Sequence, residues 1–138
     1  MDIREFLAVQ LQDDEDYARQ AAEEFGPHWT EQWTGTVNLN PSGQRSASQD
    51  DHWATLIEHT DERVTRHIIR HDPARVLAEV AAKRRILEGH ALCGTGLGLC
   101  DHAHRRPASV ESGRCGTLRD LAAPYADHPD FNPSWSRA

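Results

Sequence analysis

The sequence predicts an α+β fold, in which a long N-terminal helix, a short antiparallel β-hairpin and three further helices form one small, helix-dominated domain. Three observations lead to this prediction. Apolar residues recur at three- and four-residue steps over residues 2–24 and again beyond Asp61. The dipeptide Asp72-Pro73 has the pattern of a helix start. A chain of 138 residues can bury enough surface for one hydrophobic core, so residues 1–138 are expected to form a single domain.

The first helix is predicted over residues 2–24. An acidic run at residues 13–16 interrupts its apolar pattern and is expected to face water. Gly26 and Pro27 end the helix, because glycine suits the C-cap and proline cannot continue the helix. Seven residues are expected to share one face of this helix: Ile3, Phe6, Leu7, Leu11, Tyr17, Ala18 and Ala21.

Two short strands are predicted next, joined by the polar, turn-rich residues 40–51. The tryptophans of the chain are expected to cover this hairpin and to fill the core. An exposed partner-binding surface is the alternative, because tryptophan is enriched at interaction hot spots. The apolar residues concerned are Trp29, Trp33, Val37, Leu39, Trp53, Leu56, Ile57 and, near the C-terminus, Trp135.

Three more helices are predicted in the second half of the chain. The first begins after Asp61 and ends at His71, the second runs from Pro73 to Gly89, and the last runs from Thr117 to about residue 126. The tail after residue 127 is expected to be extended, because residues before proline avoid helical angles. Residues expected to face the core are Val64, Ile68, Ile69, Val76, Val80, Leu87, Leu118, Leu121, Ala122, Phe131 and Trp135.

The net charge of −7 is unevenly distributed. Residues 1–62, the acidic helix and hairpin, hold 14 acidic residues and 3 arginines, a charge of −11. Residues 63–138, the basic helical half with a Cys/His-containing loop at 90–115, hold 12 basic and 8 acidic residues, a charge of +4. This asymmetry favours complementary surfaces within one molecule or between copies, and it restricts any nucleic-acid contact to the second half. The basic residues concerned are Arg75, Lys83, Arg84, Arg85, His104, Arg105, Arg106, Arg114 and Arg119.

The sequence favours a cytoplasmic protein. It has no run of 18 apolar residues that would span a bilayer. Its N-terminus lacks the basic segment and apolar stretch of a secretory signal. Three cysteines are a poor framework for disulfides, and cysteines clustered beside histidines point to a metal instead.

A structural zinc ion bound by His90, Cys93, Cys100 and Cys115 is the most specific hypothesis. Zinc prefers tetrahedral sulfur and nitrogen ligands, and these residues lie at the two ends of a glycine-rich loop and within it. Zinc would order a loop that has little apolar surface of its own. His102 or His104 could replace His90. The spacing of Cys93 and Cys100 is longer than in common zinc motifs, and a flexible loop with three reduced thiols and no metal is the alternative.

A second candidate site consists of His67, His71 and His128. His67 and His71 are four residues apart, the spacing of the zincin motif, but Ile68 stands where that motif has glutamate. A metal with open coordination at these three residues would make a metal-dependent hydrolase. Local roles for these histidines, at a helix end and among arginines, are the simpler interpretation.

Two stretches, HIIRHDPARVLAEVAAKRRIL at 67–87 and CGTLRDLAAPYADHPDF at 115–131, resemble the hallmarks of domain of unknown function 6221. This family occurs in actinobacteria, including streptomycetes, and in their phages. The resemblance extends to the acidic first helix and to a Gly-Pro-Trp-like segment, here one residue longer at Gly26-Pro27-His28-Trp29, and it excludes about 38–60 and 91–113. It implies no activity. Many relatives carry cysteines before the final helix and others lack them, so a metal would stabilise only a subset.

These observations favour a non-enzymatic accessory or interaction module whose partner is an unknown protein or a second copy, because no set of residues combines an activated group with an open site. The alternatives are the metal-dependent hydrolase at the three histidines and a small regulator that contacts nucleic acid through the basic half.

Overall fold

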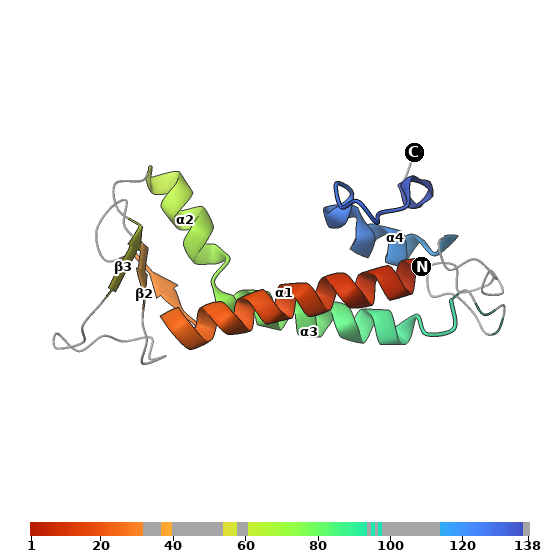
Figure 1. The fold of residues 1–138 in the computed structure, drawn as a ribbon, viewed down its shortest axis with the longest axis horizontal. Coiled ribbons are helices and arrows are strands. Elements are labelled where there is room, and N and C mark those ends of the chain that lie inside the picture. The colour runs from red at the N-terminus through yellow and green to blue at the C-terminus, as the bar shows by residue number, and fades with distance from the viewer. Residues whose placement is uncertain are drawn as a thin grey trace. The chain divides into compact units, whose positions relative to one another are not determined.

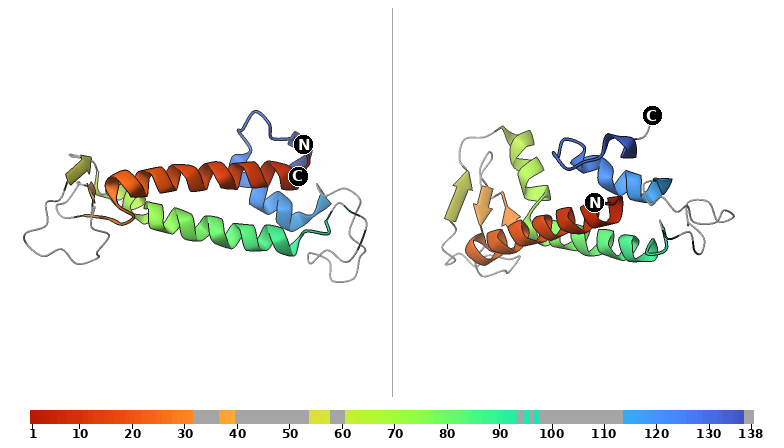
Figure 2. Two further views of the ribbon diagram at one scale, coloured as in Figure 1. Left: turned by 60° about the horizontal axis from the view of Figure 1, so that its bottom comes forward. Right: turned by 45° about the vertical axis from the view of Figure 1, so that its right-hand side comes forward.

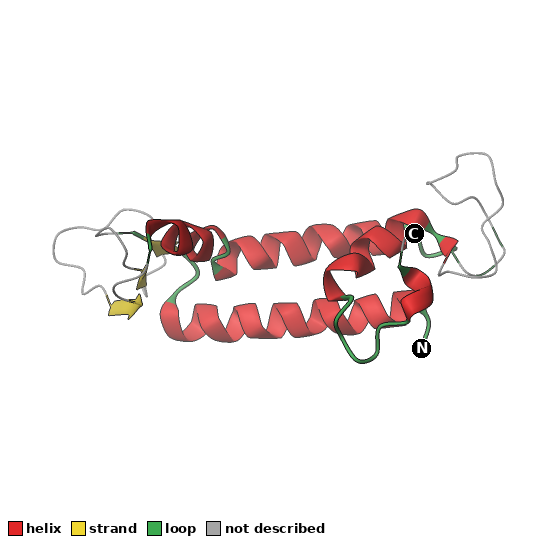
Figure 3. Ribbon diagram, turned by 90° about the horizontal axis from the view of Figure 1, so that it is seen from above, coloured by secondary structure: helices red, strands yellow, loops and turns green. Residues whose placement is uncertain are grey.

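The computed structural model describes residues 1–31, 37–39, 54–57, 61–93, 95, 97 and 114–136. Helices dominate these residues, and Figure 1 and Figure 3 show how they follow one another. No helix in these ranges is sufficiently long and apolar to cross a membrane. The elements are α1 (Ile3–Phe25), β1 (Trp29–Thr30), β2 (Val37–Leu39), β3 (Ala54–Ile57), α2 (Glu62–Arg70), α3 (Pro73–Gly89), α4 (Gly116–Ala122) and the 3-10 helices η3 (Ala123–Tyr125) and η4 (Pro133–Trp135).

Helix α1 has the predicted position. Its start is capped by Asp2, whose Oδ1 accepts the backbone N–H groups of Arg4 and Glu5 at 2.7 and 2.9 Å. Its end is fixed by Gly26, whose φ of 80° is a conformation that glycine adopts without a Cβ penalty. The prediction for Tyr17 is wrong, because its side chain is 74% exposed. Tyr17 directly precedes the buried Ala18 and therefore points about 100° away from it around the helix.

Helices α2 and α3 both begin at aspartate caps, and the cap at Asp72 was predicted. Asp61 accepts the backbone N–H of Arg63 at 2.8 Å, and Asp72 accepts that of Arg75 at 2.9 Å. The predicted inward face of α2 is wrong in one respect, because Val64 is 48% exposed and Thr65 is fully buried. The buried face is therefore centred one residue later than the apolar pattern suggested, and it continues through half-buried residues 68 and 69.

The three strands pair antiparallel in the order β1-β2-β3. Trp29 pairs with Leu39, and Val37 pairs with Ile57, with an irregularity between Val37 and Asn38. The connecting residues 32–36 and 40–53 lie outside the described residues, as do Trp33 and Trp53, so the predicted hairpin stays a prediction. Of the side chains in this region, Val37 is fully buried.

The described residues divide into two compact units. The sheet unit, residues 14–80, holds the strands, α2 and parts of α1 and α3. The terminal unit, residues 1–13 and 81–138, joins the start of α1 to the end of α3, α4 and the C-terminal segment. In the terminal unit, α4 and the segment after it lie beside the first turns of α1 (Figure 2). Its buried core comprises Ile3, Phe6, Leu7, Cys93, Cys115, Leu118, Ala122 and Trp135.

The C-terminal segment differs from the prediction. Helix α4 ends at Ala122 and continues as the 3-10 helix η3, which contains Pro124. The tail is not simply extended, because Pro133–Trp135 form the 3-10 helix η4. Trp135 is buried and Phe131 is half-buried, which confirms that the tail docks on the core.

Candidate metal centre

His90 and Cys93 are placed by the end of α3. The backbone N–H of His90 is shared between the carbonyls of Ile86 and Leu87 at 3.2 Å each, so His90 still belongs to the last helical turn. The N–H of Cys93 then donates to the carbonyl of His90 at 3.0 Å. This tight turn brings the side chains at positions 90 and 93 to the same side of the chain.

Cys115 is placed by the start of α4. It is the N-cap residue, with extended φ and ψ of −68° and 118°, and its carbonyl accepts the N–H of Arg119 at 3.0 Å. Its side chain does not cap the helix, in contrast to the aspartates before α2 and α3. The thiol turns instead toward the end of α3, where it meets His90.

Both sulfurs approach the same nitrogen. The Sγ of Cys93 lies 3.5 Å from His90 Nδ1, and the Sγ of Cys115 lies 3.4 Å from it. With Zn–S and Zn–N bonds of about 2.3 and 2.05 Å, tetrahedral angles give a sulfur-to-nitrogen separation of about 3.6 Å. One ligand atom from each residue lies within 4.8 Å of the others. The two sulfur-to-nitrogen distances therefore match those around one tetrahedral ion.

A hydrogen bond at His90 Nδ1 accounts for the approach of only one of the two thiols. An imidazole nitrogen offers either one N–H or one lone pair, so Nδ1 can form one good hydrogen bond with one thiol. A metal ion at the centre of the group would satisfy both sulfurs and the nitrogen together. The second sulfur is thus the observation that favours a metal over a simple thiol–imidazole pair.

The three side chains are buried. His90, Cys93 and Cys115 are each 5% exposed, and both cysteines belong to the core of the terminal unit. Buried cysteine is common, because the thiol behaves as a small apolar group. A buried imidazole needs polar partners, since leaving it without them costs free energy. This buried group could hold a metal ion.

The other predicted ligands lie outside the described residues. Cys100 follows Cys93 in the segment 98–113, and so do His102 and His104, the two alternatives to His90. Three of the four predicted ligands are brought together by the ends of two helices, while the position of the fourth stays a prediction.

The sequence of residues 1–137 matches the family described as Family of unknown function (DUF6221). The chain is a member of DUF6221. This membership confirms the resemblance seen in the two stretches that include α3 and α4. No curated protein and no solved structure matches the chain. DUF6221 therefore supplies a family for the chain but no ligand set, so the metal centre rests on its own geometry.

The predicted site of His67, His71 and His128 stays a prediction, because its members are divided between the two units. His67 and His71 belong to the sheet unit of this DUF6221 chain, and His128 belongs to the terminal unit. His128 has a local role, because its ring packs 5.7 Å from that of Phe6 and its Nδ1 accepts the N–H of Asp130 at 3.2 Å. Among the described residues, the three-member group with metal-binding spacing is that of His90, Cys93 and Cys115.

Several basic residues of the second half contact the protein itself. Lys83 lies 6.0 Å above the ring of Tyr125, and Arg84 donates to Gln12 at 2.9 Å. Arg75 pairs with Glu79 at 2.7 Å. These side chains are thus partly engaged, and residues 104–106 lie outside the described residues.

Sequence reasoning missed two features that support the centre. Phe6 is the hub of an aromatic cluster, with ring centroids at 6.2 Å from Tyr125, 6.0 Å from Phe131 and 5.2 Å from Trp135. Arg119 donates to three carbonyls of the tail, those of Ser134, Trp135 and Ser136. Both depend on contacts distant in sequence, and no local pattern signals them.

A surface depression of about 430 Å³ lies along the C-terminal part of α3. Its lining includes Arg85, Ile86, Gly89 and His90. His90, which is 5% exposed, is the member of the buried group that also lines this depression.

Proposed function

We propose that this DUF6221 member is a non-enzymatic accessory module whose terminal unit is held together by a structural zinc ion. The ligands are His90, Cys93, Cys115 and, from the segment between the two helices, Cys100. The observation that carries the proposal is the approach of two buried sulfurs, at 3.4 and 3.5 Å, to a single imidazole nitrogen. Cys100 completes the set because zinc prefers a fourth protein ligand in structural sites.

A zinc ion in this position joins the end of α3 to the start of α4. Four protein ligands leave no coordination position for water, so the ion would stabilise the fold instead of activating a nucleophile. Its binding free energy would become folding free energy, because the ligands come together only in the folded chain. We also propose that residues 1–138 form a single domain, since both α1 and α3 contribute residues to each compact unit.

Properties of the sequence support the proposed location of the protein in the cell and the proposed class of partner. Reduced thiols beside an imidazole are typical of a reducing compartment, which supports the cytoplasm. The likeness of residues 67–87 and 115–131 to family members from actinobacteria and their phages supports that origin. The charges of −11 and +4 on the two halves favour another protein, or a second copy, as the partner.

The decisive experiment measures the metal content of untagged protein by elemental analysis and native mass spectrometry. We expect one zinc per chain to remain tightly bound after dialysis. Cys93→Ser, Cys100→Ser and Cys115→Ser are each expected to lose it, because serine is a poor zinc ligand. The double variant His67→Ala/His71→Ala is the matched control and should retain the zinc.

Two results would contradict this proposal. Metal-free wild-type protein with an ordered α4 would refute the zinc centre. Zinc that survives Cys100→Ser would leave a position for water and would favour a catalytic ion. Cobalt substitution distinguishes an ion with four protein ligands from one that also binds water, because the absorption spectrum of cobalt reports coordination geometry and the number of thiolate ligands.

The alternative role in nucleic-acid binding has a simple test. Retention on immobilised DNA at low salt, lost as salt is raised, would support contact through the basic half. Retention equal to that of an uncharged resin would exclude it.

A further inference from the structure

We propose that His67 and His71 form a second, exposed binding site for divalent metal ions such as Ni²⁺, Cu²⁺ or Zn²⁺, independent of the buried cysteines. His67 lies in the last turn of α2, and His71 is its C-cap residue. The centroids of the two imidazole rings are 4.5 Å apart, with an angle of 43° between the ring planes. Residues four apart share one face of a helix, so both rings can reach a common ion.

The orientation of His71 is fixed by a hydrogen bond. Its Nδ1 lies 2.9 Å from the backbone carbonyl oxygen of His67. A carbonyl oxygen can only accept, so this contact places the proton on Nδ1 and leaves the lone pair on Nε2. Metal-binding histidines are commonly held in this way, with one ring nitrogen donating to a carbonyl and the other directed at the ion.

Both histidines are accessible. His67 and His71 are exposed, while Thr65 is the buried residue of α2. An ion could therefore bind without any change in the packing of the sheet unit. Two protein ligands would leave further coordination positions for water, unlike the four-ligand centre proposed above.

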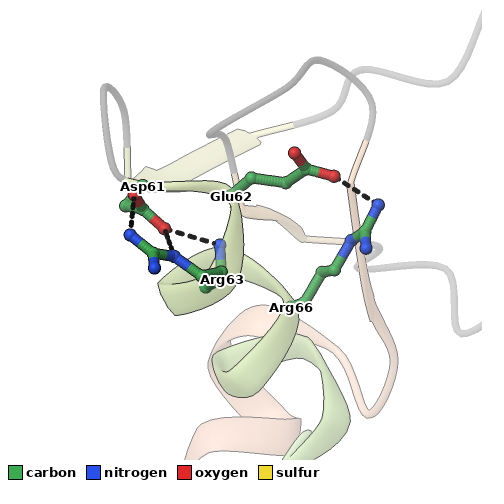
Figure 4. Close-up of polar contacts among 4 residues, drawn as sticks. All are labelled: Asp61, Glu62, Arg63 and Arg66. Carbon is green, nitrogen blue, oxygen red and sulfur yellow. Dashed lines mark hydrogen bonds and ion pairs between the residues drawn. The ribbon is translucent and has the colours of Figure 1, made fainter.

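The type of ligand, and not the surrounding charge, selects the class of ion. Arg63 is paired with Asp61 at 2.9 Å and Arg66 with Glu62, so both guanidinium groups are largely compensated (Figure 4). Arg70 adds an exposed positive charge to the same helix. Hard cations such as Mg²⁺ and Ca²⁺ require oxygen ligands, whereas imidazole nitrogen binds Ni²⁺, Cu²⁺ and Zn²⁺ well despite the neighbouring positive charge.

Asp72, the acidic group that follows His71 in the chain, is already engaged. Its Oδ1 caps α3 through the N–H of Arg75, and its Oδ2 lies 3.4 Å from Nδ1 of His28. The site is therefore assigned to the two imidazoles alone.

The test is a titration of untagged protein with Ni²⁺, followed by isothermal calorimetry and by equilibrium dialysis. The protein is first given one equivalent of zinc, which the four-ligand centre binds more tightly than two exposed imidazoles, so that the pair on α2 stays open to Ni²⁺. We expect one Ni²⁺ to bind per chain, unaffected by a large excess of Mg²⁺. His67→Ala and His71→Ala should each raise the dissociation constant at least about tenfold, the effect that loss of even an outer-shell partner produces. His128→Ala, which removes a histidine elsewhere, should leave it unchanged.

Equal Ni²⁺ binding by the wild type and by both alanine variants would overturn the proposal, as would loss of the Ni²⁺ by Mg²⁺ competition. Circular dichroism confirms that each variant is folded, which is expected because both side chains are exposed. The Cys93→Ser/Cys115→Ser variant separates this proposal from the zinc centre: it should lose the buried zinc and keep the site on α2.

Discussion

The two compact units of this chain are stabilised in different ways. The terminal unit has a connected core of large side chains, in which Phe6 contacts three other aromatic rings of the C-terminal segment. In the sheet unit, the buried residues among the described side chains are small or β-branched: Ala18, Gly26, Val37, Thr65, Pro73 and Val80. Its helices depend visibly on local caps at Asp61 and Asp72.

This contrast shows why the proposed metal belongs to the terminal unit. That unit brings together residues 1–13 and 81–138, and its core includes the side chains of two cysteines. The proposed metal would close this long-range structure by joining the ends of α3 and α4, whereas local capping is sufficient for short elements. Four predictions test the comparison, beginning with the largest expected effect.

Removing the metal should destabilise the terminal unit selectively. A chelator, or Cys115→Ser, should lower the free energy of unfolding of this unit by about 4 kcal/mol or more, because loss of a structural metal is among the most damaging changes. Hydrogen exchange should show lost protection in α4 and retained protection in α2. Equal loss in both helices would remove the distinction between the units.

Phe6→Ala should cost about 3–5 kcal/mol in the free energy of unfolding, because it leaves a cavity beneath three aromatic rings. Urea denaturation measures this value. Val9→Ala is the matched control on the same helix, since Val9 is 50% exposed. A change within about 0.5 kcal/mol is expected there. Similar values for the two variants would show that Phe6 is not the centre of the core.

Arg119→Met should loosen the tail. The guanidinium group donates to the carbonyls of Trp135, Ser134 and Ser136 at 2.9, 2.7 and 2.9 Å. Methionine keeps much of the apolar stem and removes all donors, so a cost of about 1–3 kcal/mol is expected. The fluorescence of Trp135 and the hydrogen exchange of η4 should both report increased exposure. Arg70→Met, at an exposed position of α2, is the control.

The smallest expected effect is a loss of stability at acidic pH through the protonation of Asp61. The pKa of Asp61 lies below its usual 3.8, because the Arg63 side chain and then the Arg63 backbone N–H donate to its carboxylate. A lowered folded-state pKa means that this stabilisation is fully present above pH 3.8 and is lost as the pH falls through the lower value. An NMR titration should therefore show the Asp61 carboxyl titrating below pH 3.8. Arg63→Met should return its midpoint toward the usual value, and an unchanged midpoint would contradict the assigned cause.

Local signals explain what could be predicted from the sequence. The bounds of α3 follow from Asp72-Pro73 and from Gly89, and the structure has the helix at Pro73–Gly89. His90, Cys93 and Cys115 lie together in a group that could hold a metal, because the end of one helix and the start of the next bring them to one place. The bound ion and the fourth ligand stay predictions, since they depend on a segment whose pattern specifies no element.

Long-range contacts explain most of the rest. Tyr17 and Val64 were assigned to buried faces from apolar spacing alone, but a difference of one residue rotates a side chain by about 100° around the helix. The role of Phe6 could not be foreseen, because its partners lie more than a hundred residues later in the chain. The functions of Arg119 and His128 likewise depend on the folded tail.

The division of the chain also has a consequence for its synthesis. The sheet unit is one continuous stretch, residues 14–80, whereas the terminal unit needs both the first 13 residues and those after residue 80. A ribosome therefore delivers all of the sheet unit before it delivers α4 or Trp135. The apolar face of residues 3–11 therefore stays without its packing contacts until residues 93–135 have been synthesised. Binding of the proposed metal would be among the last events of folding.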